Sequence, residues 1–375
     1  MEKNYTVKMS SKIMNFCFSS FNCLSSSENA SHQQDSQALW NLQAFSYDEL
    51  KIATDGFRSS NKIGEGGFGF VYKGILEDGR RVAVKVLSAG SKQGDREFMS
   101  EIASISNIRH KNLVKLHGGC IDGSSKLLVY EYMENNSLAH ILLGGEENRA
   151  MLSWKARREI AVGIGRALAY IHEEVKPHIV HRDIKLSNIL LDQNFAPKVS
   201  DFGLSRLFFD SVTHLTTGVA GTLGYLAPEY AVSGRLTRKA DVYSFGVLLL
   251  EIVSGRTAID FDPDVGEFFL VQKAWEMYRS NKLVQMVDPV LNEMRFSEQD
   301  VDRFLKVALM CVQQKARLRP NMSTVVKMMC NEIDIRNMQI SDPGLITNIM
   351  DVKIGNPRSS SSSFSKMLSP QFQTS

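Results

Sequence analysis

The segment His181-Arg182-Asp183-Ile184-Lys185-Leu186-Ser187-Asn188 constrains this chain more than any other. It holds a carboxylate, a cation and an amide close together, and a second carboxylate follows eighteen residues after Asp183, in Asp201-Phe202-Gly203. A glycine-rich stretch and a lone strand lysine, Lys85, precede both. Each feature alone arises easily by chance, whereas the four in this order do not. We therefore expect a fold that gathers four distant segments into one site.

These four elements supply the groups that phosphoryl transfer from ATP requires. We expect Asp183 to accept or orient the proton of the substrate hydroxyl, and Lys185 to neutralise the γ-phosphate during transfer. Asn188 and Asp201 offer hard oxygen ligands, which suit Mg²⁺. Lys85 would grip the α- and β-phosphates. A surface cluster of salt bridges is the competing interpretation, but it does not explain why Asn188 and Asp201 follow at these spacings.

The glycine-rich stretch Gly64-Glu65-Gly66-Gly67-Phe68-Gly69 fits two kinds of phosphate-binding turn. A dinucleotide-binding turn needs a helix directly after it and an acidic residue about 20 positions further on. Here Phe70-Val71-Tyr72-Lys73 follows, which is typical of a strand. We therefore predict a loop between two strands of a hairpin, where the missing Cβ atoms let the backbone approach the phosphates.

Lys85 ends an apolar strand, Val82-Ala83-Val84-Lys85. A lone lysine on a strand usually faces solvent, but this one stands between the glycine hairpin and a helix that carries carboxylates. Glu97 and Glu101 lie four residues apart and so share a helix face. Spacing alone therefore does not decide which of them pairs with Lys85.

Composition sets the outer limits of the prediction. The chain has 375 residues, 43% of them hydrophobic, which is enough for two lobes. A net charge of +3 gives no argument for nucleic acid as a partner, so no such partner is expected.

The five cysteines are scattered without metal spacing, which favours a reducing, cytosolic compartment. We expect no transmembrane helix, because no apolar run reaches 18 residues, and no N-myristoylation, because Glu2 follows the initiator Met1.

Periodicity predicts an α+β chain of two lobes. Residues 63–133 alternate and are rich in Val, Tyr and Leu, which indicates antiparallel sheet. One helix interrupts this sheet, and from Ser137 onward helices dominate, with Ser153 as a predicted N-cap and residues 242–253 as a buried helix. We expect a bilobal fold in which a small sheet N-lobe with one helix (57–130) precedes a larger helical C-lobe (134–331). The interrupting helix carries an apolar stripe of Phe98, Ile102, Ile105 and Ile108.

The two ends of the chain differ from the middle. Residues 1–44 are expected to form a disordered arm, and residues 332–375 a flexible, serine-rich tail. Basic residues beside cysteines and aromatics suggest that the arm is an acylated membrane tether; a tail with incidental cysteines is the alternative. The residues concerned are Lys3, Lys8, Lys12, Phe16, Cys17, Phe18, Phe21 and Cys23.

From about residue 57 to residue 331 the chain resembles the eukaryotic protein kinase family, on the motifs given above. Three further strings resemble plant receptor-like kinases more narrowly: Tyr47-Asp48-Glu49-Leu50, Gly221-Thr222-Leu223-Gly224-Tyr225-Leu226-Ala227-Pro228-Glu229-Tyr230 and Asp241-Val242-Tyr243-Ser244-Phe245-Gly246-Val247. Without an ectodomain or a membrane span, the chain looks like a receptor-like cytoplasmic kinase. The stretch Asp342-Pro343-Gly344-Leu345-Ile346 is similar to the cold-responsive protein kinase subgroup.

The resemblance implies roles for further residues. It selects Glu101 as the partner of Lys85 and leaves Glu97 as a solvated charge. It makes Tyr130 the gatekeeper and places the backbone of Glu131 and Met133 against the adenine edge. Ordinary core packing is the competing explanation for the residues that would sandwich the ring. Those residues are Ile63, Val71, Ala83 and Leu190.

The segment from Asp201 to Glu229 resembles an activation segment. Arg182 leaves a buried guanidinium that calls for an anion, which a phosphothreonine could supply. Thr217 is the first candidate and Thr216 the second, although Gly218 stands where relatives carry arginine. Thr222 is expected near the substrate hydroxyl. Two structural contacts are also implied: Glu229 with Arg319, and Asp241 with the catalytic loop.

These observations predict an ATP- and Mg²⁺-dependent serine/threonine protein kinase. The resemblance implies protein substrates, upstream membrane receptor kinases and a role in plant stress or immune signalling, with the enzyme cytoplasmic and peripheral at the plasma membrane through acylated Cys17 and Cys23. Two alternatives stay open at this point. One is a pseudokinase scaffold that binds partners without transferring phosphate, and the other is dual specificity that includes tyrosine.

Overall fold

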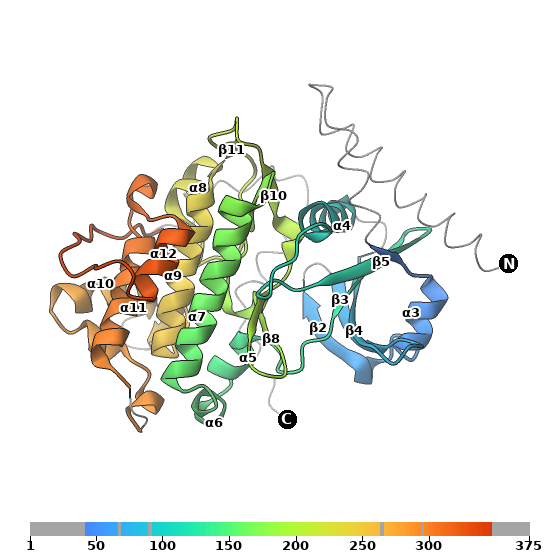
Figure 1. Cartoon of the computed structure of the whole chain (residues 1–375), viewed down its shortest axis with the longest axis horizontal. Helices are drawn as coiled ribbons and strands as arrows, with labels where there is room; N and C mark the ends of the chain where they lie inside the picture. Colours follow the sequence, from blue (N-terminus) through green and yellow to red (C-terminus); the bar gives the residue numbers. More distant parts are fainter. Residues whose placement is uncertain (1–41, 67–68, 89–91, 263–265, 294–295, 347–375) are drawn as a thin grey trace.

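A six-stranded sheet forms the N-lobe (Figure 1). The computed structural model describes residues 42–66, 69–88, 92–262, 266–293 and 296–346. The strand order is β1-β5-β6-β4-β3-β2; the β1–β5 pair is parallel and the other pairs are antiparallel. The strands are β1 (Gln43–Ala44), β2 (Lys62–Gly66), β3 (Gly69–Ile75), β4 (Arg81–Leu87), β5 (Leu116–Asp122) and β6 (Ser125–Glu131).

Two helices accompany this sheet. Helix α3 (Tyr47–Ala53) begins with a capping box, in which the Ser46 hydroxyl accepts from the Glu49 N–H at 3.0 Å. Helix α4 (Lys92–Ile105) is the interrupting helix that the apolar stripe predicted. Phe98, Ile102 and Ile105 are buried, so the predicted packing face is confirmed, while Ile108 lies beyond the end of the helix and is only partly buried.

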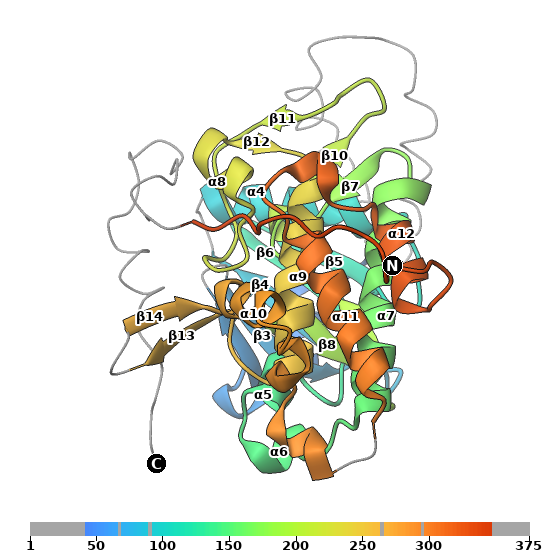
Figure 2. The same ribbon diagram turned by 90° about the vertical axis from the view of Figure 1, so that its left-hand side faces the viewer.

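Helices make up most of the C-lobe, as the sequence predicted (Figure 2). The hydroxyl of Ser153 caps α7 by accepting from the Ala156 N–H at 3.4 Å. Helix α9 is buried along nearly its whole length and packs against α11, while α7 packs against α12. The helices are α5 (Leu138–Leu142), α6 (Glu146–Ala150), α7 (Trp154–Ala169), α8 (Pro228–Ser233), α9 (Arg238–Ser254), α10 (Leu270–Arg279), α11 (Glu298–Cys311) and α12 (Met322–Met329).

Short two-stranded sheets shape the loops of the C-lobe. One of them, β8–β9, frames the segment between Asn188 and Asp201, so it fixes the distance between the two predicted metal ligands. The pairs are β7 (His178–Val180) with β10 (Arg206–Phe208), β8 (Ile189–Leu191) with β9 (Pro197–Val199), β11 (Leu215–Thr216) with β12 (Arg235–Leu236), and β13 (Ile259–Asp262) with β14 (Gly266–Phe269).

The packed structure extends past both predicted lobe boundaries. Phe45 and Leu50 are fully buried under the sheet. At the other end, residues 332–346 run across the C-lobe, where the Tyr243 hydroxyl donates to the Gly344 carbonyl at 2.7 Å (Figure 2). This differs from the flexible tail expected there, because a serine-rich composition after residue 358 says little about the apolar residues before it. Residues 1–41 and 347–375 lie outside the described residues, and with them the predicted tether.

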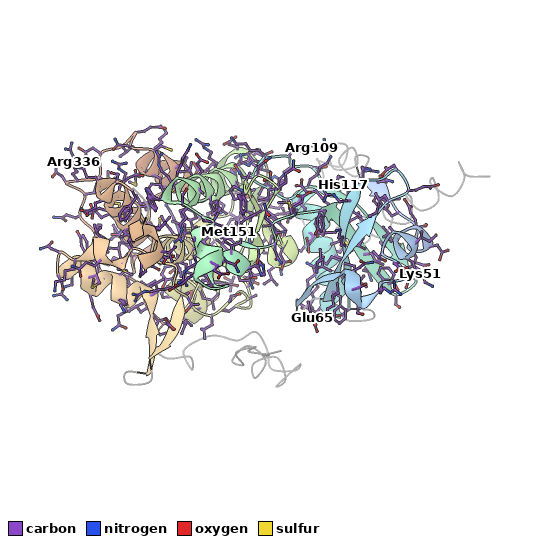
Figure 3. The ribbon with its side chains drawn as sticks, turned by 90° about the horizontal axis from the view of Figure 1, so that it is seen from below. Lys51, Glu65, Arg109, His117, Met151 and Arg336 are labelled. Carbon is purple, nitrogen blue, oxygen red and sulfur yellow. The ribbon has the colours of Figure 1, made fainter. Side chains whose placement is uncertain are left out.

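The side chains of both lobes are drawn in Figure 3, where Lys51 and Glu65 mark the N-lobe and Met151 and Arg336 mark the C-lobe. Among the helices that the structure describes, none has the length and apolar character needed to cross a membrane.

Candidate active site

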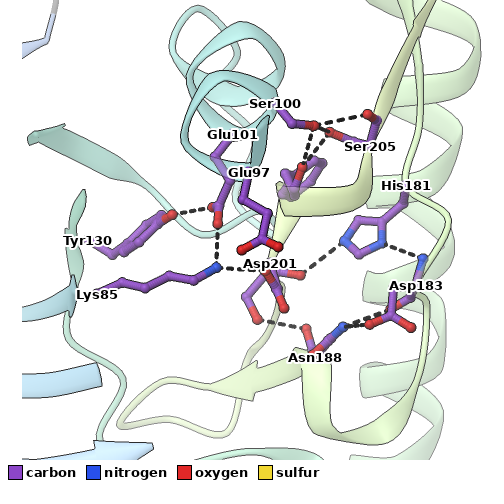
Figure 4. Close-up of polar contacts among 12 residues, drawn as sticks. Lys85, Glu97, Ser100, Glu101, Tyr130, His181, Asp183, Asn188, Asp201 and Ser205 are labelled. Atoms are coloured by element: carbon purple, nitrogen blue, oxygen red, sulfur yellow. Dashed lines mark hydrogen bonds and ion pairs between the residues drawn. The ribbon is translucent and has the colours of Figure 1, made fainter. Parts of the chain in front are cut away.

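Lys85 joins three elements at the junction of the lobes (Figure 4). From β4, its Nζ donates to Asp201 Oδ1 at 2.8 Å and to Glu101 Oε1 of α4. The lysine side chain is only 11% exposed. Burial works against the charge on Lys85, but the two carboxylates prevail and raise its pKa above the ordinary value. The ion pair expected between Lys85 and Glu101 is therefore formed, and it ties α4 to the sheet.

The second oxygen of Glu101 is held by Tyr130. The tyrosine hydroxyl donates to Glu101 Oε2. Burial and the nearby charge of Glu101 raise the pKa of Tyr130 well above its usual value, so the hydroxyl stays a donor. Sequence reasoning placed Tyr130 beside the nucleotide but missed this contact, because Tyr130 and Glu101 lie far apart in the sequence and belong to no common motif.

Glu97 is not the solvated charge that the resemblance implied. Its side chain is fully buried on the same face of α4 as Glu101. The turn at Gly203 packs against it, and a Cβ atom added at Gly203 would lie 3.3 Å from Glu97 Cγ. Burial raises the pKa of Glu97 to about 7. The expectation was wrong because it left out the turn that follows Asp201, which covers this face of the helix.

Asp183 is the centre of a second network, which brings together residues from two segments. Its Oδ1 accepts from the Thr222 hydroxyl at 2.6 Å, and its Oδ2 accepts from Asn188 Nδ2 and Lys185 Nζ, each at 2.9 Å. Lys185 Nζ also donates to Thr222 Oγ1 at 2.8 Å. The predicted catalytic-loop residues thus converge on one buried carboxylate, and Thr222 of the activation segment joins them.

Buried Asp241 holds the catalytic loop in shape. Its carboxylate accepts from the backbone N–H groups of His181 (2.7 Å) and Arg182 (2.8 Å), and from His172 Nε2 (2.8 Å). These bonds support Arg182 in a left-handed conformation with φ of 74°, which is uncommon outside glycine. His181 in turn donates from Nε2 to the Ser200 carbonyl at 2.9 Å and accepts from the Asp183 N–H at 3.2 Å. The bracing role expected of Asp241 is therefore confirmed.

Asn188 and Asp201 have the chemistry that a magnesium ion requires. Asn188 uses Nδ2 to hold Asp183, and Asp201 uses Oδ1 to hold Lys85, so each has an oxygen that these contacts do not use. Burial opposes ionisation of Asp201, yet Lys85 lowers its pKa below the ordinary value, so it is a carboxylate at neutral pH. No cluster of three or more His, Cys, Asp or Glu residues suited to a metal exists in the described ranges. Two protein oxygens match Mg²⁺, which keeps several of its waters.

The glycine-rich stretch is a β-hairpin, as predicted. Gly64 is paired with Val71, and Gly66 with Gly69, across β2 and β3. Gly69 has φ of 132°, and a Cβ atom there would lie 2.0 Å from the Val86 carbonyl oxygen, so the position admits only glycine. Gly67 and Phe68 lie outside the described residues.

The other residues predicted to surround the nucleotide lie on β2, β3 and β4, near the end of β6, and on β8 of the C-lobe. Ala83 shares a strand face with Lys85 and is in register with Tyr130, while Val71 is in register with Lys85. Met133 is buried and Ile63 is 42% exposed. Leu190 lies on β8, half-buried. Glu131 ends β6 and its carboxylate pairs with Lys198 of β9 at 2.9 Å, across the two lobes.

The activation segment is anchored by two arginines. Arg319 makes a two-pronged ion pair with Glu229, at 2.7 and 2.8 Å, as expected. Arg182 is buried and donates to neutral groups only: the carbonyls of Leu204 (3.0 Å) and Gly218 (2.8 Å) and the Tyr230 hydroxyl. Thr216 is exposed on β11, and Thr217 directly precedes Gly218. Thr217 therefore lies near the Arg182 guanidinium, whereas Thr216 is in register with Arg235 of β12.

Comparison with known proteins identifies the family. The model of the protein kinase domain matches residues 57–329. This chain belongs to the protein kinase family. Cold-responsive protein kinase 1 of Arabidopsis thaliana is 53% identical over 322 residues, which cover 85% of this chain and 82% of that protein.

Receptor-like kinases of the same plant are similarly close. Two probable LRR receptor-like serine/threonine-protein kinases are 50% and 51% identical over 81% and 78% of this kinase. The matched region spans only 29% and 28% of their own length. The kinase is thus an ATP-dependent serine/threonine protein kinase. Its similarity to the receptor-like proteins is limited to the matched region.

Proposed function

We propose that Asp183 accepts or orients the proton of the substrate hydroxyl while Lys185 offsets the charge on the transferring phosphoryl group. The observation that carries this proposal is the network on Asp183, in which Thr222, Asn188 and Lys185 all lie within 2.9 Å of its carboxylate. A carboxylate held on three sides cannot rotate away from an incoming hydroxyl. Such fixed positioning is the main contribution a protein makes to phosphoryl transfer.

The same proposal gives the remaining groups their roles. Lys85, held by Glu101, contacts the α- and β-phosphates of ATP. Asn188 and Asp201 hold Mg²⁺, which neutralises charge on the phosphates when bound. The residues proposed to surround the nucleotide are Ile63, Gly64, Glu65, Gly66, Gly67, Phe68, Gly69, Val71, Ala83, Tyr130, Glu131, Met133 and Leu190.

Two substitutions test the catalytic assignment. Asp183→Asn keeps the shape of the side chain but removes its charge, and Lys85→Met removes the cation that faces the phosphates. Each should lower the rate of phosphate transfer to a generic protein substrate by about 100-fold or more. Lys327→Met, at an exposed position on α12, is the matched control and should keep full activity. Thermal melting verifies that each variant is folded; a folded variant with near-native turnover would overturn the assignment.

For the cellular role we propose receptor-linked stress or immune signalling, with a membrane receptor kinase upstream. The support is the identity with a cold-responsive kinase and with receptor-like kinases. Phosphoproteomes of plant tissue that expresses either the wild type or Lys85→Met should differ at proteins of these responses. If the two phosphoproteomes are the same under cold and immune stimulation, the signalling proposal is wrong even though the enzyme is a kinase.

For location we propose attachment to the plasma membrane through acylated Cys17 and Cys23, which lie outside the described residues. One acyl chain binds membranes only weakly, so two chains, or one chain with the neighbouring lysines, are needed for stable attachment. A fluorescent reporter fused to residues 1–44 should therefore associate with the plasma membrane. Replacing both cysteines with serine should release it to the cytosol, while Ser25→Ala serves as a control that should stay bound. A cytosolic wild-type reporter, or a double variant that stays bound, contradicts the tether.

A further inference from the structure

Three serine hydroxyls meet where helix α4 faces the turn after Asp201. Figure 4 shows two of them, Ser100 and Ser205. Ser100 and Ser104 come from one face of α4, and Ser205 follows the 3-10 turn Phe202–Leu204. Ser104 and Ser205 are 3% and 2% exposed. We call this group the serine clasp (Ser100, Ser104, Ser205). It is a polar cluster in a region where the surrounding helix face is otherwise apolar or acidic.

Each hydroxyl of the clasp has an acceptor for its proton. Ser205 donates to the Phe202 carbonyl at 2.6 Å. Ser104 lies 2.6 Å from the Ser205 oxygen and can donate to it. Ser100 donates to the Ser205 carbonyl at 2.9 Å or to the Phe202 carbonyl at 3.1 Å. Each of the three hydroxyl donors therefore has an acceptor, so the cluster is fully satisfied. A buried polar network in which every group has a partner favours a single arrangement of the elements that carry it.

The clasp joins the two elements whose relative position decides how Lys85 is held. Helix α4 carries Glu101, and the turn begins at Asp201; Lys85 binds both carboxylates. Ser100 adjoins Glu101 in the helix, and the carbonyl of Phe202 follows Asp201 directly. A shift of α4 away from the turn would break the clasp and the Glu101 contact together.

We propose that Ser205 is a positioning residue which, through Ser104 and Ser100, fixes α4 against the turn and so sets the geometry of Glu101, Lys85 and Asp201. The proposal deepens the proposed function, since it rests on these three residues forming the nucleotide site. The hydroxyls do more than fill space: replacing Ser205 with alanine leaves the buried Ser104 hydroxyl without its partner in the turn. It also removes one donor to the Phe202 carbonyl, which keeps the Ser205 N–H at 3.0 Å. A buried hydrogen-bonding group without a partner costs free energy. In the variant, a position of α4 further from the turn is therefore more favourable than it is in the wild type.

Three variants separate hydrogen bonding from packing. Ser205→Ala removes the hydroxyl, and Ser205→Cys fills the space with a weak donor and acceptor. Ser104→Ala breaks the same bond from the other side. Ser106→Ala, just past the end of α4, is the matched control. In the nucleotide-free enzyme, the backbone amides of residues 96–105 should exchange with deuterium about 3- to 30-fold faster in the first three variants than in the control. Amides of α9 should exchange at the wild-type rate in all four.

Kinetics provide the second measurement. kcat/KM for ATP should fall about 3- to 30-fold in Ser205→Ala, Ser205→Cys and Ser104→Ala. The double variant Ser104→Ala/Ser205→Ala should be no worse than the more damaging single, because both break one bond. If Ser205→Cys behaves as wild type, if the effects add, or if α4 exchange is unchanged, the clasp is only packing and the proposal is overturned. Hydrogen exchange needs no turnover, so the position of α4 can be tested even if the catalytic roles proposed for Asp183 and Lys85 are wrong.

Discussion

At the residue scale, the charges around Lys85 are unbalanced. Lys85 is paired with Glu101 and Asp201, and a third carboxylate, Glu97, is buried close to them. Glu97 Oε1 accepts from Gln93 at 2.8 Å, but Glu97 Oε2 has no hydrogen-bond partner among the residues described. Burial therefore raises the pKa of Glu97 to about 7. The side chain changes its protonation state in the physiological range.

This shift predicts how stability depends on pH. The folded kinase binds a proton at Glu97 with a pKa of about 7, against 4.5 for the ordinary carboxyl group. The folded state therefore holds more protons between these values, and its stability falls as pH rises from 4.5 through 7. Glu97→Gln mimics the protonated form and removes this loss. At pH 8 the variant should be more stable than wild type by up to about 3 kcal/mol, with little difference at pH 4.5.

Urea unfolding of both proteins at several pH values between 4.5 and 8 measures this difference. Glu332→Gln, at an exposed position, is the control and should follow the wild type throughout. Parallel stability curves for wild type and Glu97→Gln would show that Glu97 keeps an ordinary pKa.

The same residues show how far the sequence determines the site. Lys85, Asp183, Asn188 and Asp201 could be predicted because each belongs to a motif with fixed spacing. Helical periodicity placed Glu97 and Glu101 on one face but could not show which residues cover it. That depends on the turn at Gly203, which is distant from Glu97 in the sequence. The Tyr130–Glu101 contact needed the assembled fold for the same reason.

At the element scale, Arg182 holds the activation segment through neutral partners. Arg182 donates to two carbonyls and one hydroxyl. Arg206 of β10 lies close by; burial and the charges of Arg182 and Arg96 lower its pKa, so positive charge gathers here. A phosphate on Thr217 would meet this charge and replace hydrogen bonds to neutral acceptors with stronger ones to an anion.

We therefore expect Thr217→Ala to lower activity only partly. Because the segment is already ordered, losing the phosphate should cost about 3- to 30-fold in kcat/KM, equivalent to one or two charge-assisted hydrogen bonds. Thr216→Ala should have a smaller effect, since Thr216 is one residue further from Gly218. Initial rates of both variants, together with mass spectrometry of the wild type, test this expectation. An unmodified segment in fully active wild-type enzyme would exclude activation at either threonine.

Some helices and strands could be predicted from the sequence better than others. Helix α7 was predicted because its apolar residues recur on one face over several turns, and α9 because its residues are apolar nearly all round. The short pairs β7–β10 and β11–β12 could not be predicted, because strands of two or three residues carry no period of their own. They exist because the loops that hold Arg182 and Thr217 are brought together by the helices around them.

At the scale of the whole molecule, the packed unit is larger than the family match. The match covers residues 57–329, whereas among the described residues packing extends from Leu42 to Ile346. Strand β1 lies so close to β5 that a Cβ atom at Gly118 would be 1.8 Å from the Gln43 carbonyl oxygen. The glycine at 118 is thus explained by a segment outside the catalytic motifs.

A chain cut to residues 57–329 should accordingly be less stable than one of residues 43–346. It loses the buried side chains of Phe45 and Leu50, each worth about 1.5–3 kcal/mol, and the contact of Gly344 with Tyr243. Chemical unfolding should show a loss of about 3–6 kcal/mol. Within the longer chain, Phe45→Ala should account for much of this loss, and Ile52→Ala, at a residue that is 81% exposed, for almost none. Equal stability of the two chains would mean that the flanking segments only rest on the surface.

The hydrogen bond between Tyr130 and Glu101 has a consequence for inhibitor design. By resemblance Tyr130 is the gatekeeper, and a bulky side chain there would close the space behind the adenine and exclude by shape any compound that extends past it. The usual remedy in chemical genetics is to replace the gatekeeper with glycine or alanine, which admits enlarged inhibitors. In this kinase that replacement also removes the hydroxyl that holds Glu101 Oε2. The drug-sensitised allele would therefore carry its own catalytic defect, and any phenotype it produces must be compared with the uninhibited variant rather than with the wild type.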